Sequence, residues 1–245
     1  MKVLKTINWK AVAMGLCMTV AITAFSAMAE EGKKGHPSML DNMKDAGFVE
    51  YLLLLTSIAG FALALQALVT LRAHLLRPPE LVSELQNLVQ EGNVEGAFDV
   101  AQGDNSFLGT VALATLSNAQ YGKEAMESAL ADTAEVESNK LMNKINTLNM
   151  IAAIAPMMGL TGTTVGMIET FTVMAAGGAE ITADKMAKGI SIALICTFTG
   201  LMVAIPLLII AFFLKARLVQ IILEVQSDCN ELIRLISSGE QPAEG

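Results

Sequence analysis

The side chains that could do chemistry in this chain are hydroxyl groups inside two long apolar segments. Thr161, Thr163 and Thr164 lie close together in one segment, and Thr197 and Thr199 lie near the middle of the next. A threonine in an apolar helix can bond the carbonyl of its own helix four residues earlier, which is the structural explanation for any one of them. A polar group held in the middle of a membrane segment is also a candidate functional site.

Other kinds of chemistry have little to work with. The only histidines are His36 and His74, and Cys17, Cys196 and Cys229 have no neighbouring Cys or His at metal-ligand spacing. No nucleophile–base pair or phosphate-binding loop is present, so we expect no enzyme activity, no metal and no cofactor. The net charge of −8 and the absence of a basic patch argue against a nucleic-acid partner.

Three apolar segments indicate a membrane protein. Hydrophobic residues make up 53% of the 245 residues and charged residues only 16%. Tyr51–Leu71, Ile151–Ile168 and Gly189–Leu214 contain no charge, and neutral flanks extend the second run to Asn146–Met174 with the single acid Glu169 near its end. About 20 apolar helical residues cross a bilayer core. We therefore predict an all-α membrane protein with three transmembrane helices.

A fourth apolar run near the N-terminus is too short for a span. Three lysines precede Ala11–Phe25, and the small residues Ser26-Ala27-Met28-Ala29 follow it. This pattern predicts a signal peptide at residues 1–29; an uncleaved fourth helix is the alternative. Cleavage would place the new N-terminus in the periplasm.

The remaining chain divides at the three predicted spans. We predict a periplasmic N-terminal segment at 30–48, transmembrane helices at 49–71, 145–174 and 189–214, a cytoplasmic helical domain at 72–144, a periplasmic loop at 175–188 and a cytoplasmic helical tail at 215–245. Basic residues flank the predicted inner ends of the spans, as the positive-inside rule expects: Arg72, Arg77, Lys140, Lys144, Lys215 and Arg217.

Turn residues divide the predicted cytoplasmic domain into helices. Pro78-Pro79 precedes a helix at 80–90, Gly92-Asn93 ends it, and further helices are expected at 94–101, 106–118 and 124–144. The last of these is expected to run directly into the second span. Apolar spacing likewise predicts that the third span continues as a helix through residues 215–236.

Small residues share faces in the second and third spans. Gly159, Gly162 and Gly166 recur at intervals of three and four, and so do Thr197, Gly200 and Ala204. Such faces allow helix backbones to approach closely in lipid. Pro156, in the second span, removes one helical hydrogen bond.

Two motifs resemble the paired signature of the TolQ/ExbB/MotA proton-channel family. They read Ala155-Pro156-x-x-Gly159-Leu160-x-Gly162-Thr163-x-x-Gly166-Met167-Ile168 and Gly189-Ile190-x-x-Ala193-Leu194-x-x-Thr197-x-x-Gly200-Leu201-x-x-Ala204-Ile205-Pro206. The helical segment between the first two spans also resembles ExbB-type members.

The resemblance implies a motor subunit that converts proton-motive force into mechanical work in the bacterial inner membrane. It implies a homopentameric ring in the lipid, around two copies of a single-span ExbD/TolR-like partner that carries a membrane aspartate; a TonB-like energy transducer is a further candidate partner. Thr163 and Thr197 match the family's pore-lining threonines. Pro156, Gly159, Gly162, Gly166, Gly200 and Ala204 would pack the helices around the pore.

Two positions, one acidic and one apolar, bear on the proton route that the resemblance implies. Glu169 is either an interfacial acid or a site where protons enter. Ile192 stands where ExbB and TolQ types often carry glutamate. No acid lies within the uncharged cores of the three spans, so we expect the proton-carrying acid to come from the partner. A passive membrane scaffold and a flagellar-type stator subunit are the alternative functions.

Overall fold

The computed structural model describes residues 47–175 and 183–239, and every regular element in these ranges is helical. The elements are α3 (Gly47–Thr70), α4 (Ala73–Leu76), α5 (Pro79–Gln90), α6 (Val94–Gly103), α7 (Phe107–Ser117), the 3₁₀ turn η3 (Ala119–Tyr121), α8 (Lys123–Ala175) and α9 (Ala183–Gly239). The predicted signal peptide at 1–29 lies outside the described residues. So do most of the predicted segment at 30–48 and residues 176–182 of the predicted loop.

Three of these helices are long and apolar enough to cross a membrane. The candidate spans lie in Phe48–Thr70, Lys123–Thr172 and Gly189–Ser238. Large apolar side chains on them are exposed, among them Leu55, Met157, Leu160, Leu194 and Phe212. Exposed side chains of this kind suit contact with lipid or with other membrane helices. The prediction of an all-α, multi-pass membrane protein is confirmed at this level.

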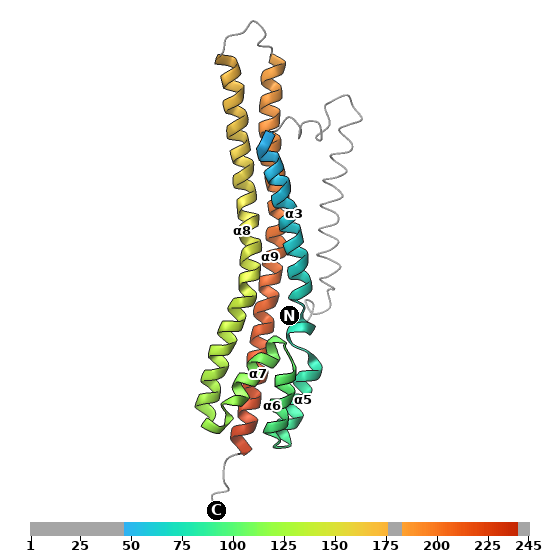
Figure 1. The fold of residues 1–245 in the computed structure, drawn as a ribbon, viewed down its shortest axis with the longest axis vertical. Helices are drawn as coiled ribbons and strands as arrows, with labels where there is room; N and C mark the ends of the chain where they lie inside the picture. The colour runs from blue at the N-terminus through green and yellow to red at the C-terminus, as the bar shows by residue number, and fades with distance from the viewer. Residues whose placement is uncertain (1–46, 176–182, 240–245) are drawn as a thin grey trace, which may run out of the picture. The chain divides into compact units, whose positions relative to one another are not determined.

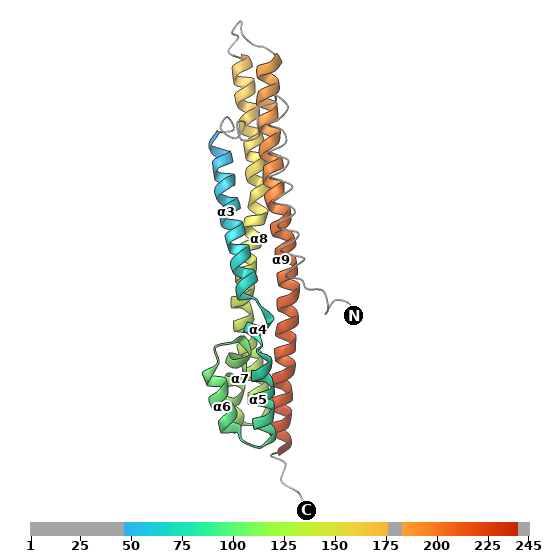
Figure 2. The same ribbon diagram turned by 90° about the vertical axis from the view of Figure 1, so that its right-hand side faces the viewer.

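The described chain divides into two compact units. The first takes in the chain up to Ala64 together with Thr147–Ala211, and the second takes in Leu65–Asn146 and the chain from Phe212 onward. In the first unit, α3 lies beside α8 and α9 (Figures 1 and 2). The buried residues Glu50, Leu53, Gly60 and Ala64 recur along α3 at intervals that are mostly three or four, so one stripe of α3 faces its neighbours.

Contacts within the first unit fix the direction of the three helices. The Thr56 hydroxyl lies 3.5 Å from the Met158 sulfur. A Cβ atom on Gly60 would lie 2.7 Å from a methyl group of Leu207 on α9 and 3.2 Å from one of Ile151 on α8. As the residue number increases along α3 from Thr56 to Gly60, the residue number of the neighbour on α8 falls from Met158 to Ile151. Helix α3 runs antiparallel to α8 and parallel to α9.

Helix boundaries in the second unit follow from local chemistry. Asn93 caps α6 by accepting a 2.9 Å hydrogen bond from the Gly96 N–H, and Ser106 caps α7 in the same way. Gly92 and Gly122 have φ angles of 76° and 89°, which residues with a Cβ rarely adopt. The helices expected at 80–90, 94–101 and 106–118 correspond to α5, α6 and α7. The predicted continuity of 124–144 with the second span appears as α8.

The second unit has its own apolar core. Five of its helices contribute fully buried side chains, which include Leu85 on α5, Ala97 on α6, Leu108 and Val111 on α7, Met126 on α8, and Leu218, Val225, Leu232 and Ile233 on α9. The α9 residues continue the apolar periodicity that the sequence shows after Lys215, and the helix extends to Gly239.

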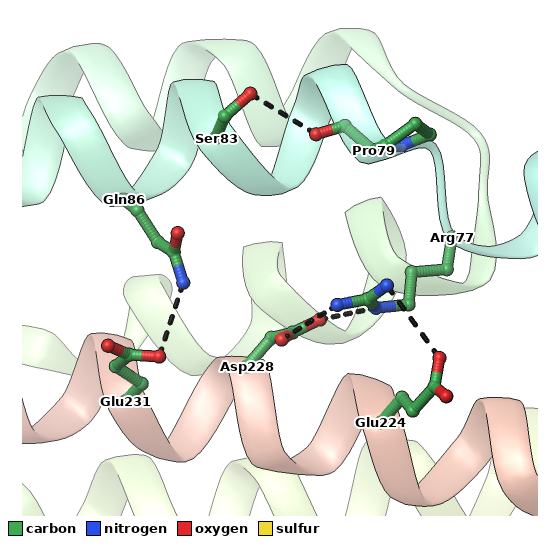
Figure 3. Close-up of polar contacts among 7 residues, drawn as sticks. All are labelled: Arg77, Pro79, Ser83, Gln86, Glu224, Asp228 and Glu231. Atoms are coloured by element: carbon green, nitrogen blue, oxygen red, sulfur yellow. Dashed lines mark hydrogen bonds and ion pairs between the residues drawn. The ribbon is translucent and has the colours of Figure 1, made fainter. Parts of the chain in front are cut away.

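An ion pair holds the segment before α5 against α9 in the second unit (Figure 3). The Arg77 guanidinium donates two hydrogen bonds to the Asp228 carboxylate, at 2.6 and 3.0 Å, and lies 3.7 Å from Glu224. Asp228 thereby raises the pKa of Arg77, which stays charged. Gln86 on α5 adds a 3.2 Å hydrogen bond to Glu231. The C-terminal part of α9 is therefore bound to this unit by directional contacts as well as by its core.

Candidate functional site

Helices α8 and α9 approach each other at glycines in the first unit. A Cβ atom on Gly159 would lie 2.8 Å from the Cys196 carbonyl oxygen, and one on Gly200 would lie 2.7 Å from the Ala155 carbonyl oxygen. Both obstacles are backbone atoms, which cannot rotate away. The missing side chains therefore allow the two backbones to lie in direct contact.

The other small residues of the two motifs lie at the same contact. A Cβ atom on Gly162 would lie 2.7 Å from the Cys196 Cβ, and one on Gly166 would lie 3.1 Å from the Ala193 Cβ. Ala204 is 1% exposed, and α8 continues through Pro156. These residues pack α8 on α9 within one chain. Their packing around a pore remains a prediction.

Most span threonines on these helices bond their own helix. The hydroxyls of Thr161, Thr163 and Thr164 donate to carbonyls three or four residues earlier, at 2.9, 2.7 and 3.0 Å. Thr199 does the same, at 3.0 Å. Satisfied hydroxyls of this kind can still accept a hydrogen bond from another group, because a hydroxyl oxygen has two lone pairs.

Thr197 differs because its hydroxyl reaches the other helix. It donates to the Gly159 carbonyl of α8, at 3.4 Å. In an α-helix that carbonyl also accepts the N–H of the residue four positions later, here Thr163. The two threonines singled out by the sequence therefore lie within about one helical turn of each other, and both are half-buried in the single chain. Their lining of a pore is not tested by one chain.

Glu169 lies further along α8 than the threonine pair. Its side chain is exposed, and it is seven residues beyond Gly162, which corresponds to about 10 Å along the helix. An exposed acid at this position fits either of its two sequence interpretations. Ile192 is half-buried on α9, one turn before Cys196.

The structure adds an acid that the sequence interpretation left out. Glu50 is 2% exposed, and its Oε2 atom has no hydrogen-bond partner in the part of the chain that the structure describes. Its carboxyl group forms a hydrogen bond with the thiol of Cys196 on α9. The signal was its place on the buried stripe of α3, three residues before Leu53. The predicted span at 49–71 includes residue 50, but its uncharged run begins at Tyr51, so no role was predicted for Glu50.

Within the described ranges no cluster of His, Cys, Asp and Glu could hold a metal ion. The polar groups of the first unit are instead scattered hydroxyls and one buried carboxyl group between apolar helices. Such groups can bind and pass a proton, because each can donate or accept a hydrogen bond.

Comparison with known proteins matches the sequence of this chain to one family. The profile of the MotA/TolQ/ExbB proton channel family matches residues 103–227, which is about half of the chain. The match includes the end of α6, α7, the whole of α8 and most of α9. It therefore contains both threonines and all the glycines of the α8–α9 contact.

Individual relatives agree with the profile. The putative biopolymer transport protein ExbB homolog of Methanothermobacter thermautotrophicus is 28% identical over 183 residues, 74% of this chain and 64% of its own length. The putative biopolymer transport protein ExbB-like 1 of Synechocystis is 30% identical over 176 residues, 71% of this chain and 69% of its own. The Tol-Pal system protein TolQ of Haemophilus influenzae is 39% identical over 77 residues, about a third of each chain. The chain belongs to the MotA/TolQ/ExbB proton channel family, whose members are channel proteins and not enzymes.

Proposed function

We propose that this chain is the multi-span subunit of an ion-driven motor in the bacterial inner membrane. In this proposal five copies form a ring around two copies of a single-span ExbD/TolR-like partner, and proton flow through the ring drives mechanical work. The family match over α8 and α9 is the observation that carries the proposal. A TonB-like transducer would receive the work if the chain acts in transport, as its relatives named biopolymer transport proteins do.

The threonine pair supports a proton path at the α8–α9 contact. Thr163 and Thr197 lie within about one turn of each other on antiparallel helices, so five copies would place ten hydroxyls at one level. A hydroxyl can donate to a charged carboxylate and accept from a protonated one. A belt of this kind would serve a partner aspartate in both of its protonation states, while the apolar residues above and below would resist leakage of water.

The charge pattern supports one orientation. In the proposed topology the N-terminus is periplasmic, and the second unit and the C-terminus are cytoplasmic. Arg72, Arg77, Lys140, Lys144, Lys215 and Arg217 then all lie on the cytoplasmic side. Cysteine accessibility tests this directly, since a cysteine placed at exposed Glu84 should react with an impermeant maleimide only after the inner membrane is opened.

The assembly is tested by purifying the tagged chain from its native membrane in mild detergent. Native mass spectrometry should show five copies of the chain with two copies of one co-purifying single-span protein. That protein should carry an aspartate in its span. A stable monomer or dimer of the chain that has no such protein bound would contradict the proposed assembly.

A further inference from the structure

Glu50 is a buried carboxyl group that the proposed function does not use. Its side chain is 2% exposed, and among the described residues its Oε2 atom has no hydrogen-bond partner. In its charged form, a carboxylate that is buried without full hydrogen bonding carries a cost of desolvation, and protonation removes that cost.

The position of Glu50 in the first unit is deeper than its place in the sequence indicates. It lies in the first turn of α3, but it forms a hydrogen bond with Cys196, and a Cβ atom on Gly162 would lie 3.4 Å from the neighbouring Val49. Gly162 is six residues inside the nearer end of the uncharged run at 151–168, and Cys196 is seven residues inside the run at 189–214. These separations correspond to about 10 Å along each helix. Glu50 is thus level with the interior of both helices.

The same contacts bring Glu50 to the level of the threonine pair. Thr163 directly follows Gly162, and Thr197 directly follows Cys196. A residue that carries protons at this height along the helices would lie on the proton path proposed for the hydroxyls of Thr163 and Thr197. This inference rests on the proposed function.

The described stretches of α3, α8 and α9 beside Glu50 carry no fixed positive charge, and Lys188, the nearest cation on α9 before Cys196, is eight residues away from it. Residues 47–64 of α3 and 147–175 of α8 contain no Lys, Arg or His, and α9 contains none between Gly189 and Ala211. The titratable group that contacts Glu50 from α9 is the Cys196 thiol, and on α8 a Cβ atom on Gly162 would lie 3.4 Å from the neighbouring Val49. Among the described residues of these helix segments no cation holds the carboxylate charged, so gain and loss of a proton would change the net charge of this site.

We propose that Glu50 is a proton-carrying residue of this chain. Its carboxylate takes up a proton at one stage of the motor cycle and releases the same proton at a later stage. No other bond is made or broken. The contact that the structure gives this carboxyl group is the Cys196 thiol, a group that can donate a proton in a hydrogen bond. The proposal therefore concerns a proton, and the acid of a partner is not the only one in the path.

The first test measures protonation and does not depend on transport. Infrared spectra of the purified complex would be recorded across the pH range in which it stays intact, for the wild type, Glu50→Gln and the exposed control Glu84→Gln. A protonated carboxyl group has a carbonyl stretch that a carboxylate lacks. We expect a band that is present in the wild type and in Glu84→Gln, weakens as pH rises, and is absent from Glu50→Gln. Equal spectra for the wild type and Glu50→Gln, or a Glu50 band that does not change with pH, would overturn the proposal.

The second test measures flux in liposomes that contain the complex with its co-purified partner. Glu50→Gln keeps the size of the side chain and its ability to form hydrogen bonds, and thermal unfolding would verify that it folds. We expect proton flux to fall about tenfold or more, the scale for removing a proton-transfer group, while Glu84→Gln conducts normally. If Glu50→Gln conducts as the wild type does, Glu50 carries no protons although the channel function stands.

Two other outcomes separate this proposal from the proposed function. If the wild type with its partner moves no ion, the channel function fails, and the infrared titration still decides whether Glu50 changes its protonation. If the wild type moves Na⁺ without any proton uptake, the assignment of Glu50 as a proton carrier fails.

Discussion

Replacing Gly200 by alanine should push α8 and α9 apart. The new Cβ atom would lie 2.7 Å from the Ala155 carbonyl oxygen and 3.3 Å from the Gly159 Cα, whereas non-bonded carbon contacts are favourable at about 3.5–4.0 Å. Both obstacles are backbone atoms of α8, so no side-chain rotation relieves the overlap. The helices must separate, and the contacts along their shared face weaken.

The magnitude follows from two opposing terms. Overpacking a well-packed contact costs about 1–3 kcal/mol, and alanine gains back up to about 1 kcal/mol over glycine in a helix interior. Because the obstacle is backbone, we place the cost in the upper part of its range and expect a net loss of about 1–2 kcal/mol. Gly166→Ala should cost less, because its Cβ would meet the Ala193 Cβ at 3.1 Å. Gly103→Ala is the control, since no atom lies within 4 Å of its Cβ position.

Far-ultraviolet circular dichroism during heating in detergent measures the effect. A loss of 1 kcal/mol corresponds to about 2–4 °C in a chain of this size, so Gly200→Ala should melt about 2–8 °C lower than the wild type. The melting temperature of Gly166→Ala should lie between those of Gly200→Ala and the wild type. Gly103→Ala should melt no lower than the wild type. If Gly200→Ala melts at the wild-type temperature or above it, the two backbones are not in contact at this residue.

Three further perturbations act on the second unit. Asp228→Asn should lower the free energy of unfolding by about 1.5–3 kcal/mol, because Arg77 loses a charged partner for both hydrogen bonds. Glu224→Gln should lower it by less than about 0.5 kcal/mol, because Glu224 is exposed and lies 3.7 Å from Arg77. Equal losses would show that Asp228 has no special role. Cys229 is fully buried, so we expect it to react with maleimide only after denaturation; rapid labelling of the native protein would contradict its packing. Ser106→Ala should cost about 1 kcal/mol through loss of the α7 cap, and an unchanged melting temperature would show that the cap is dispensable.

The sequence predicted the elements well because their signals are local. Uncharged runs set the spans, and turn residues set the limits of α5, α6 and α7, where Asn93 and Ser106 act as caps. The glycine spacing in the second span indicated a close approach, and the structure places Gly159 and Gly200 against the opposite backbone. These features depend on chain chemistry within one or two helical turns.

The sequence did not predict the environment of Glu50, because that depends on how three helices are staggered. Counted along the chain, Glu50 precedes the uncharged run of α3 and resembles a boundary residue. The register that sets it beside Cys196 is a tertiary property with no local signal except its place on the buried stripe. The same limit applies to Thr197, whose bond to α8 distinguishes it from threonines that bond their own helix.

The most direct test of the proposed motor function is proton flux through the reconstituted complex. The chain and its co-purified single-span partner would be placed in liposomes with a pH-sensitive dye inside, and a potassium diffusion potential would drive protons inward. We predict flux that needs both proteins and is lost in the Thr163→Val/Thr197→Val double variant, which should still assemble as the wild type does. A double variant that assembles and conducts at the wild-type rate would contradict the proposed proton path.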